Sequence, residues 1–343
     1  MKKKIHTHGG DIYRHEHVVD FSANINFRGM PESVKRAAKE GVEYAAHYPD
    51  IACEKLREGI ARRDGVKKEH IICGNGAAEL IFSLALALKP SEALLLAPSF
   101  YEYEQALLSV DCRIRWYYTK EEQDFQPQED FLEQITEETE MVFLCNPNNP
   151  TGMVLEKDFL RKVLDRCEAC HALLVLDECF YDFLTDAGAY TMKAYVEHSQ
   201  HIFILRAFTK MYAMAGLRLG YGFCSNETLM EQLHLVRQPW SVSIPAQMAG
   251  RAAVEEVAFA KESVEAITAE RFFMRTELLK KGYQVLDGRA NYLFFKGSPF
   301  LYEECLEKGF LIRDCSNYEG LCKGWYRITI RTPEENRRLL EIL

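Results

Sequence analysis

The chain has 343 residues, of which 48% are hydrophobic and 27% are charged, and its formal net charge is −9. This composition is typical of a globular enzyme, and the length fits about two domains of roughly 150 residues each. No basic cluster indicates nucleic-acid binding, and no apolar run is long enough to span a bilayer. No apolar run follows the N-terminal lysines, so we expect no signal peptide and a cytoplasmic location.

The cysteine and histidine patterns are only weak indications of a haem or metal site. We expect the 11 cysteines to be mostly buried, free thiols. Cys167–His171 has the spacing of a covalent haem site, but it ends a helical pattern that leads into an apolar strand. His6, His8, His15 and His17 lack the accompanying spacing of a metal site, so we expect solvated or substrate-facing histidines and no metal.

Short apolar segments alternate with helical patterns from about residue 50 to residue 225. The predicted strands are 70–74, 92–98, 112–119, 140–147, 172–178, 201–208 and 219–224. Helical spacing lies between most of them, for example at 77–88 and 156–169. This alternation predicts an open, mostly parallel α/β sheet with helices on both faces, in which ligands bind beyond the carboxyl ends of the strands.

The pattern changes at about residue 245. A long helical stretch, 246–282, precedes short predicted strands at 289–296 and 325–331. We therefore expect a large domain at 41–240 and a smaller α/β domain at 241–343, which the N-terminal segment 1–40 joins.

Three of the predicted strands are followed by, or end on, groups that suit a ligand. GNGAAE, residues 74–79, opens a helix whose backbone N–H groups could bind a phosphate, although a plain turn has the same pattern. Asn149, in the rigid turn NPNNPTG, could contact a ligand oxygen or serve the turn alone. Asp177 ends an apolar strand, where its carboxylate needs a partner such as a protonated ring nitrogen or a helix terminus.

Lys210 follows the strand at 201–208, and Arg218 lies eight residues further on. A partly desolvated lysine has a lowered pKa and attacks carbonyl groups, and an arginine can bind phosphate. A solvated lysine fits the apolar surroundings poorly. Together these features supply a phosphate site, an oxygen contact, an anion for a pyridinium nitrogen and a Schiff-base lysine, which is the set that pyridoxal 5'-phosphate (PLP) requires.

On these motifs the sequence resembles, over nearly its whole length, the fold-type I PLP enzymes of the aspartate aminotransferase superfamily. The resemblance implies a large domain with a mixed, mostly parallel seven-stranded sheet between helices, plus a smaller α/β domain. It implies that Lys210 is the Schiff-base lysine and that Asp177 is the partner of the pyridine nitrogen.

The resemblance also implies the remaining contacts of the cofactor and of the substrate carboxylate. They are Gly76, Ala77, Ala78, Thr209 and Arg218 at the phosphate, Phe100 on the ring, Asn149 at the phenolic oxygen, and Arg327 at the carboxylate. Tyr48 would reach the phosphate in a neighbouring subunit, which implies a homodimer.

Two groups within this superfamily compete. HGGDIYR, PWSVS, GRANYLFF and LIRDCSNYEGL look like the L-threonine-O-3-phosphate decarboxylases of cobalamin biosynthesis. Phe180 stands where histidinol-phosphate aminotransferases usually have a tyrosine. The resemblance therefore favours decarboxylation of L-threonine O-3-phosphate, with transamination of histidinol phosphate or a similar amino acid as the alternative.

A phosphorylated substrate needs further cations and donors. Arg313 would share the substrate carboxylate with Arg327 or bind the substrate phosphate. The other candidates for the phosphate are His8, Asn26 and Arg331. A position on the surface explains Arg331 equally well. Asn149 could contact the substrate as well as the cofactor. A non-catalytic PLP domain of a transcription regulator would need a helix-turn-helix, for which this chain leaves no room. The intact lysine, aspartate and arginine set argues against an inactive fold.

Overall fold

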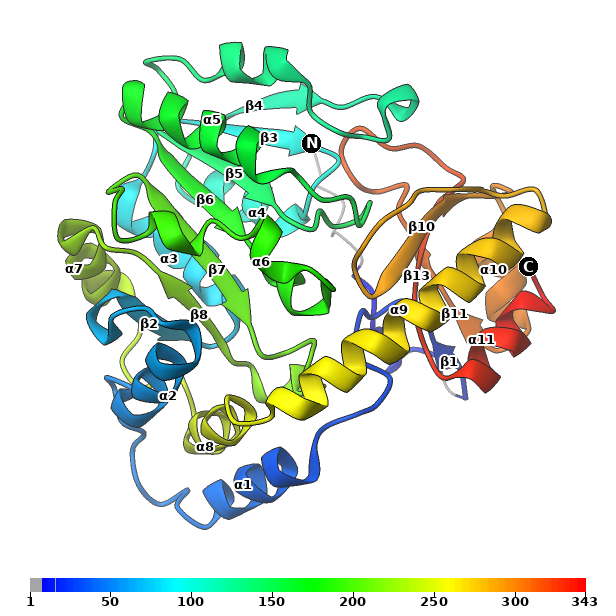
Figure 1. Ribbon diagram of the computed structural model, residues 1–343, viewed down its shortest axis with the longest axis horizontal. Coiled ribbons are helices and arrows are strands. Elements are labelled where there is room, and N and C mark those ends of the chain that lie inside the picture. The colour runs from blue at the N-terminus through cyan, green and yellow to red at the C-terminus, as the bar shows by residue number, and fades with distance from the viewer. Residues whose placement is uncertain (1–7, 16) are drawn as a thin grey trace.

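The computed structural model describes residues 8–15 and 17–343, and His6 lies outside this part of the chain. A seven-stranded sheet forms its larger part, in the order β2–β8–β7–β6–β5–β3–β4 (Figure 1). The strands are β2 (Ile71–Gly74), β3 (Glu92–Ala97), β4 (Arg113–Tyr118), β5 (Met141–Cys145), β6 (Leu173–Asp177), β7 (Ile202–Ala207) and β8 (Gly220–Phe223). The pairings of β8 with β2 and with β7 are antiparallel and the other four are parallel, so the predicted mixed, mostly parallel sheet and its seven strands are confirmed.

Helices cover both faces of this sheet, which explains the unbroken apolar runs of its central strands. Within β6, Leu174 and Leu176 belong to the core on one face, and Leu173 and Val175 belong to the core on the other. One face packs against α3 (Ala77–Leu88), α4 (Tyr101–Leu108) and α7 (Glu227–Val236), and the other against α2 (Glu54–Asp64) and α5 (Lys157–Ala169). No helix of the described residues is long and apolar enough to cross a membrane.

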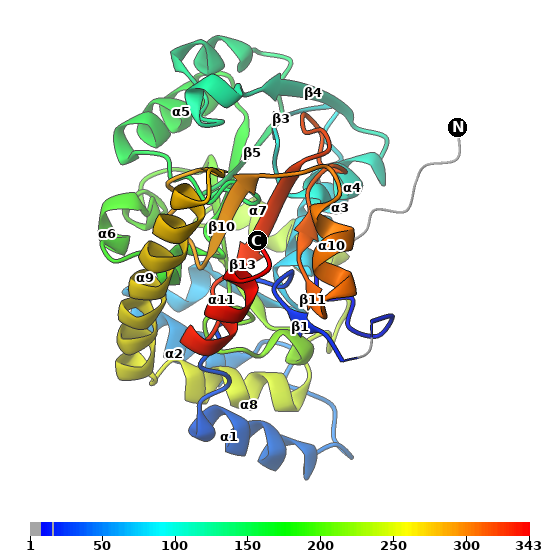
Figure 2. The same cartoon turned by 90° about the vertical axis from the view of Figure 1, so that its right-hand side faces the viewer.

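A second, smaller sheet lies beside the first (Figures 1 and 2). Its antiparallel strands are β9 (Gln284–Val285), β10 (Tyr292–Lys296), β12 (Arg313–Asp314) and β13 (Trp325–Thr329), in the order β12–β13–β10–β9. The N-terminal strand β1 (Val19–Asp20) pairs in parallel with β11 (Phe310–Leu311), and α10 (Leu301–Glu307) and α11 (Pro333–Leu340) complete this region. The N-terminal strand therefore packs with the C-terminal part of the chain.

The helical stretch predicted at 246–282 is two helices rather than one. α8 (Ile244–Ala253) packs on α1 (Glu32–Val42) and α2, whereas α9 (Val257–Lys280) crosses to the second sheet (Figure 1). The axis turns between them because the two halves pack against different partners. The boundaries near residues 40 and 240 stay a prediction, since α1 and α8 pack together across both.

The remaining helical turns are short and belong to connections. They are α6 (Ala187–Tyr190) and the 3₁₀ turns Lys68–His70, Glu121–Gln123, Glu129–Gln134, Tyr181–Phe183, Lys193–Tyr195 and Ala215–Leu217.

Candidate active site

A cavity of about 340 Å³ opens beyond the carboxyl ends of β5, β6 and β7, and residues of β12, β13 and the N-terminal segment close it. Most of the residues expected at a site line this one cavity. They are His8, Ala77, Ala78, Phe100, Asn149, Asp177, Thr209, Lys210, Arg218, Arg313 and Arg327.

One end of the cavity has the features of a phosphate site. Gly76 precedes α3 with φ +79°, and a Cβ at this position would overlap the Arg218 guanidinium. The N–H groups of Ala77 and Ala78 belong to the first turn of α3, so they have no acceptor within the helix and carry its positive dipole. Thr209 also lines the cavity. Backbone donors and a guanidinium around a position without a Cβ fit a phosphate group.

Lys210 is held at the wall of the cavity by its own backbone. Its carbonyl accepts hydrogen bonds from the N–H groups of Asn26 (3.1 Å) and Ala213 (3.3 Å). Burial, together with the charge of the nearby Arg327 guanidinium, lowers the pKa of Lys210 to about 8. A lysine with this pKa has an appreciable neutral fraction at pH 7, which makes it a nucleophile towards an aldehyde.

Asp177 is a buried carboxylate with two fixed donors. Its Oδ2 accepts from the Tyr103 hydroxyl (2.6 Å), and its Oδ1 accepts from the backbone N–H of Cys179 (2.9 Å). The Tyr103 ring stacks on Phe143 at 4.8 Å, and burial and the Asp177 charge raise the pKa of its hydroxyl. These contacts orient the carboxylate, as a partner of a protonated ring nitrogen would require.

The amides of the NPNNPTG turn hold the turn together, and one of them lines the cavity. Asn146 binds the backbone of Leu155, and Asn148 donates to the Pro98 carbonyl (3.2 Å), so these two amides hold the turn. Asn149 faces the cavity, where its Oδ1 accepts from the Arg327 guanidinium.

Two arginines reach the cavity from the second sheet. Arg313 of β12 and Arg327 of β13 are directly opposed in the antiparallel ladder, and opposed residues project from the same face. Arg327 also donates to the Ser22 carbonyl (2.9 Å), and Arg313 donates to Asn317 (2.8 Å). The Arg313 guanidinium lies over the Tyr318 ring, 5.1 Å from its centroid.

Two expected substrate contacts lie elsewhere. The Asn26 amide donates to the Met211 carbonyl (2.8 Å), so it supports the Lys210 loop and does not line the cavity. Arg331 donates to the Asp20 carbonyl (2.9 Å) and pairs with a residue of α11. Both side chains are engaged in holding neighbouring segments together, so we leave them out of the substrate site.

Tyr48 also lies outside this cavity. It is 78% exposed, and its ring stacks on Trp240 at 4.6 Å.

Several residues of the site have no counterpart in the sequence-based prediction. Tyr103 of α4 lies three residues after Phe100, which precedes the helix, and this spacing is visible in the sequence. Glu102, Cys179 and Tyr318 line the cavity because of tertiary contacts that no local pattern reveals.

A nucleophilic lysine, a fixed carboxylate and a phosphate cradle at the carboxyl ends of parallel strands define a fold-type I PLP enzyme. The chain belongs to the aminotransferase class I and II family, whose model matches residues 16–343. The cofactor is therefore PLP, and the residues described above fit its phosphate, ring nitrogen and aldehyde.

Relatives with two different activities are similar to this chain. Threonine-phosphate decarboxylase of Salmonella typhimurium is 37% identical, with 98% of this chain and 95% of that protein covered. Histidinol-phosphate aminotransferase 2 of Carboxydothermus hydrogenoformans is 33% identical, with 94% and 89% covered. The crystal structure of histidinol-phosphate aminotransferase from Clostridium acetobutylicum has a TM-score of 0.88 at 29% identity, covering 94% of this chain and 97% of that one.

Proposed function

We propose that the protein decarboxylates L-threonine O-3-phosphate to (R)-1-aminopropan-2-yl phosphate and CO2, a reaction of cobalamin biosynthesis. The observation that carries this proposal is that the cavity holds two arginines and a histidine beyond the groups that the cofactor requires. Arg327 would bind the substrate carboxylate, and Arg313 and His8 remain for a distal phosphate. The similarity to the Salmonella decarboxylase supports the same substrate class.

The residues of the cavity have distinct tasks in this reaction. When bound, PLP supplies the electron sink for the bond that breaks at Cα. Arg327 and Asn149 would orient the carboxylate, and Asp177 would hold the proton on the ring nitrogen. Departure of CO2 leaves Cα in need of one proton, which the Lys210 ammonium would donate.

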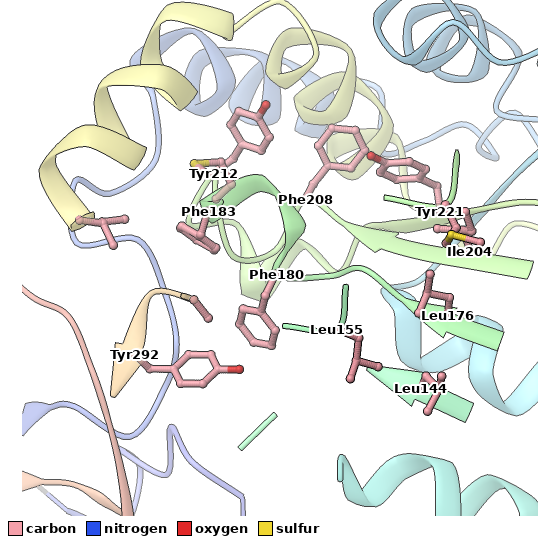
Figure 3. Packing of buried hydrophobic residues seen from close by; sticks show 14 of the residues in the cluster. Leu144, Leu155, Leu176, Phe180, Phe183, Ile204, Phe208, Tyr212, Tyr221 and Tyr292 are labelled. Atoms are coloured by element: carbon pink, nitrogen blue, oxygen red, sulfur yellow. The ribbon is translucent and has the colours of Figure 1, made fainter. Parts of the chain in front are cut away.

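Phe180 favours decarboxylation over the alternative. It lines the cavity, and its ring packs edge-to-face on Tyr292, with 5.1 Å between centroids (Figure 3). The Tyr292 hydroxyl donates to the Asn148 carbonyl (2.7 Å). This wall therefore lacks the hydroxyl that a tyrosine at position 180 would bring to the cofactor oxygen.

Transamination of histidinol phosphate is the second candidate. It needs the same Lys210, Asp177 and phosphate cradle, and the 33% identical aminotransferase supports it. Transamination breaks the Cα–H bond instead of the Cα–carboxylate bond and needs a keto acid to restore the cofactor, so a direct test distinguishes the two reactions.

The test supplies L-threonine O-3-phosphate to the PLP-loaded enzyme without a keto acid and measures CO2 and the amine product. Catalytic CO2 release supports the decarboxylase, and Phe180→Tyr then shows whether an added hydroxyl diverts the reaction. Background CO2, together with conversion of the cofactor to its amine form by histidinol phosphate, would refute the proposal in favour of the aminotransferase.

We also propose a homodimer in which Tyr48 contacts the cofactor phosphate of the partner subunit. Its exposed ring and the groove beside it, between α1, α2 and α8, support this arrangement. Tyr48→Phe should weaken cofactor binding without changing the mass measured by light scattering. A monomeric mass for the unaltered protein would contradict the proposal.

A further inference from the structure

Glu102 is a carboxylate that lines the same cavity as the cations Lys210 and Arg313. It lies in the first turn of α4, and its side chain is 14% exposed. Its Oε1 lies 3.2 Å from Nδ1 of His8, whereas the buried Oε2 has no hydrogen-bond partner among the described residues. A buried carboxylate oxygen without a donor is unfavourable, so this atom has unused capacity for a ligand.

Charged and titratable groups face Glu102 from every segment around it. They are His8 of the N-terminal segment, Tyr101 of its own helix, Asp177 at the end of β6, Lys210 after β7, Arg313 of β12 and Tyr318 of the loop before β13. Burial raises the pKa of Glu102 to about 7, and the charges of Lys210 and Arg313 limit this increase. Glu102 therefore exchanges a proton with solvent near neutral pH.

We propose that Glu102 is a specificity-determining residue that binds the distal phosphate of the substrate in its neutral form, donating the Oε2 proton to a phosphate oxygen. The inference rests on the proposed substrate class, a phosphorylated amino acid, and not on which bond at Cα breaks. His8 and Arg313 would complete the subsite, and Oε1 of Glu102 would keep its contact with the His8 ring.

The charges of the subsite explain why the neutral form is the one that binds. A phosphate bound beside Arg313 neutralises the positive charge that favours the ionised form of Glu102. The negative charge of the phosphate also repels the Glu102 carboxylate. Protonation removes this repulsion and supplies a donor to the phosphate oxygen. Because the ligand binds the protonated form, its binding raises the proton affinity of Glu102, and those carboxylates that are ionised take up a proton from solvent.

Calorimetry on the PLP-loaded enzyme tests this linkage without turnover. 3-Phosphoglycerate serves as the probe because a hydroxyl replaces its amine, and glycerate is the matched ligand without phosphate. Titrations in buffers of different ionisation enthalpy give the number of protons that the enzyme takes up on binding 3-phosphoglycerate. At pH 7 this number should be about half a proton lower for Glu102→Gln than for the unaltered enzyme. The ratio of variant to unaltered affinity should rise about tenfold between pH 6 and pH 8 for 3-phosphoglycerate, and should stay constant for glycerate.

Comparing variants at each pH cancels the ionisation of the ligand. Glu104→Gln, on the same helix and outside the cavity lining, is the control and should behave as the unaltered enzyme. Glu102→Asp replaces the amide variant if Glu102→Gln does not retain its cofactor, and it should keep the proton uptake.

An affinity ratio that is flat with pH, or that changes equally for glycerate, would overturn the role of Glu102. The outcome is independent of the reaction type. Proton linkage without CO2 release would refute only the proposed decarboxylation, whereas CO2 release without linkage would refute only this inference.

Discussion

The pKa of Lys210 controls how fast the apoenzyme can capture its cofactor, because only the neutral amine attacks an aldehyde. With a pKa of about 8, roughly one amine in ten is neutral at pH 7, compared with fewer than about one in a thousand for a solvated lysine. Arg327 is the largest cause of this lowering after burial. Removal of its charge in Arg327→Gln should raise the pKa by about one unit, so the neutral fraction at pH 7 should fall about tenfold.

Absorbance follows this capture when apoenzyme is mixed with PLP over a range of pH. The rate for the unaltered protein should rise through a midpoint near pH 8, and the midpoint for Arg327→Gln should lie higher. Arg331→Gln is the matched control, because that guanidinium bonds Asp20 and Glu335 outside the cavity. A midpoint near pH 10 for the unaltered protein would refute the effect of burial. An equal shift in both variants would refute the assignment to Arg327.

Three further substitutions test the scaffold of the site. Tyr103→Phe removes the 2.6 Å donor to Asp177 and should lower the stability of the apoenzyme by about 1.5–3 kcal/mol, measured by urea unfolding; an unchanged midpoint would contradict the role of this bond. Gly76→Ala places a Cβ at positive φ against Arg218 and should weaken PLP binding at least about tenfold in equilibrium dialysis, whereas unchanged affinity would argue against the cradle. Arg206→Met leaves the buried Glu178 carboxylate without its arginine partner and should cost about 3–5 kcal/mol in urea unfolding, with an effect below about 1 kcal/mol as the contrary result.

Local patterns in the sequence predict the large sheet well. The largely apolar strands β3, β5, β6 and β7 are buried at every position, because helices cover both faces of this parallel sheet. Local patterns do not predict the break at 254–256 between α8 and α9. No residue there breaks a helix, and the turn follows from packing against two different partners.

The substrate end of the cavity shows where prediction from the sequence stops. Arg313 and Arg331 are both arginines near strands of the second sheet, and the sequence treats them alike. Register decides between them, since Arg313 is opposed to Arg327 while Arg331 follows the strand and pairs with α11. The sequence does not predict Glu102 as a site residue, because its neighbour His8 is 94 positions away and contacts it only after the N-terminal segment has folded.

The sequence by itself determined the sheet, the cofactor class and the residues of the strand ends, because hydrophobic periodicity and turn chemistry act over a few neighbouring residues. Only the tertiary structure decided which of several arginines face the cavity and how Tyr103 orients Asp177. It also decided that an acidic side chain lies among the cations of the cavity. These features depend on strand register and on the pairing of β1 with β11, which join segments about 290 residues apart.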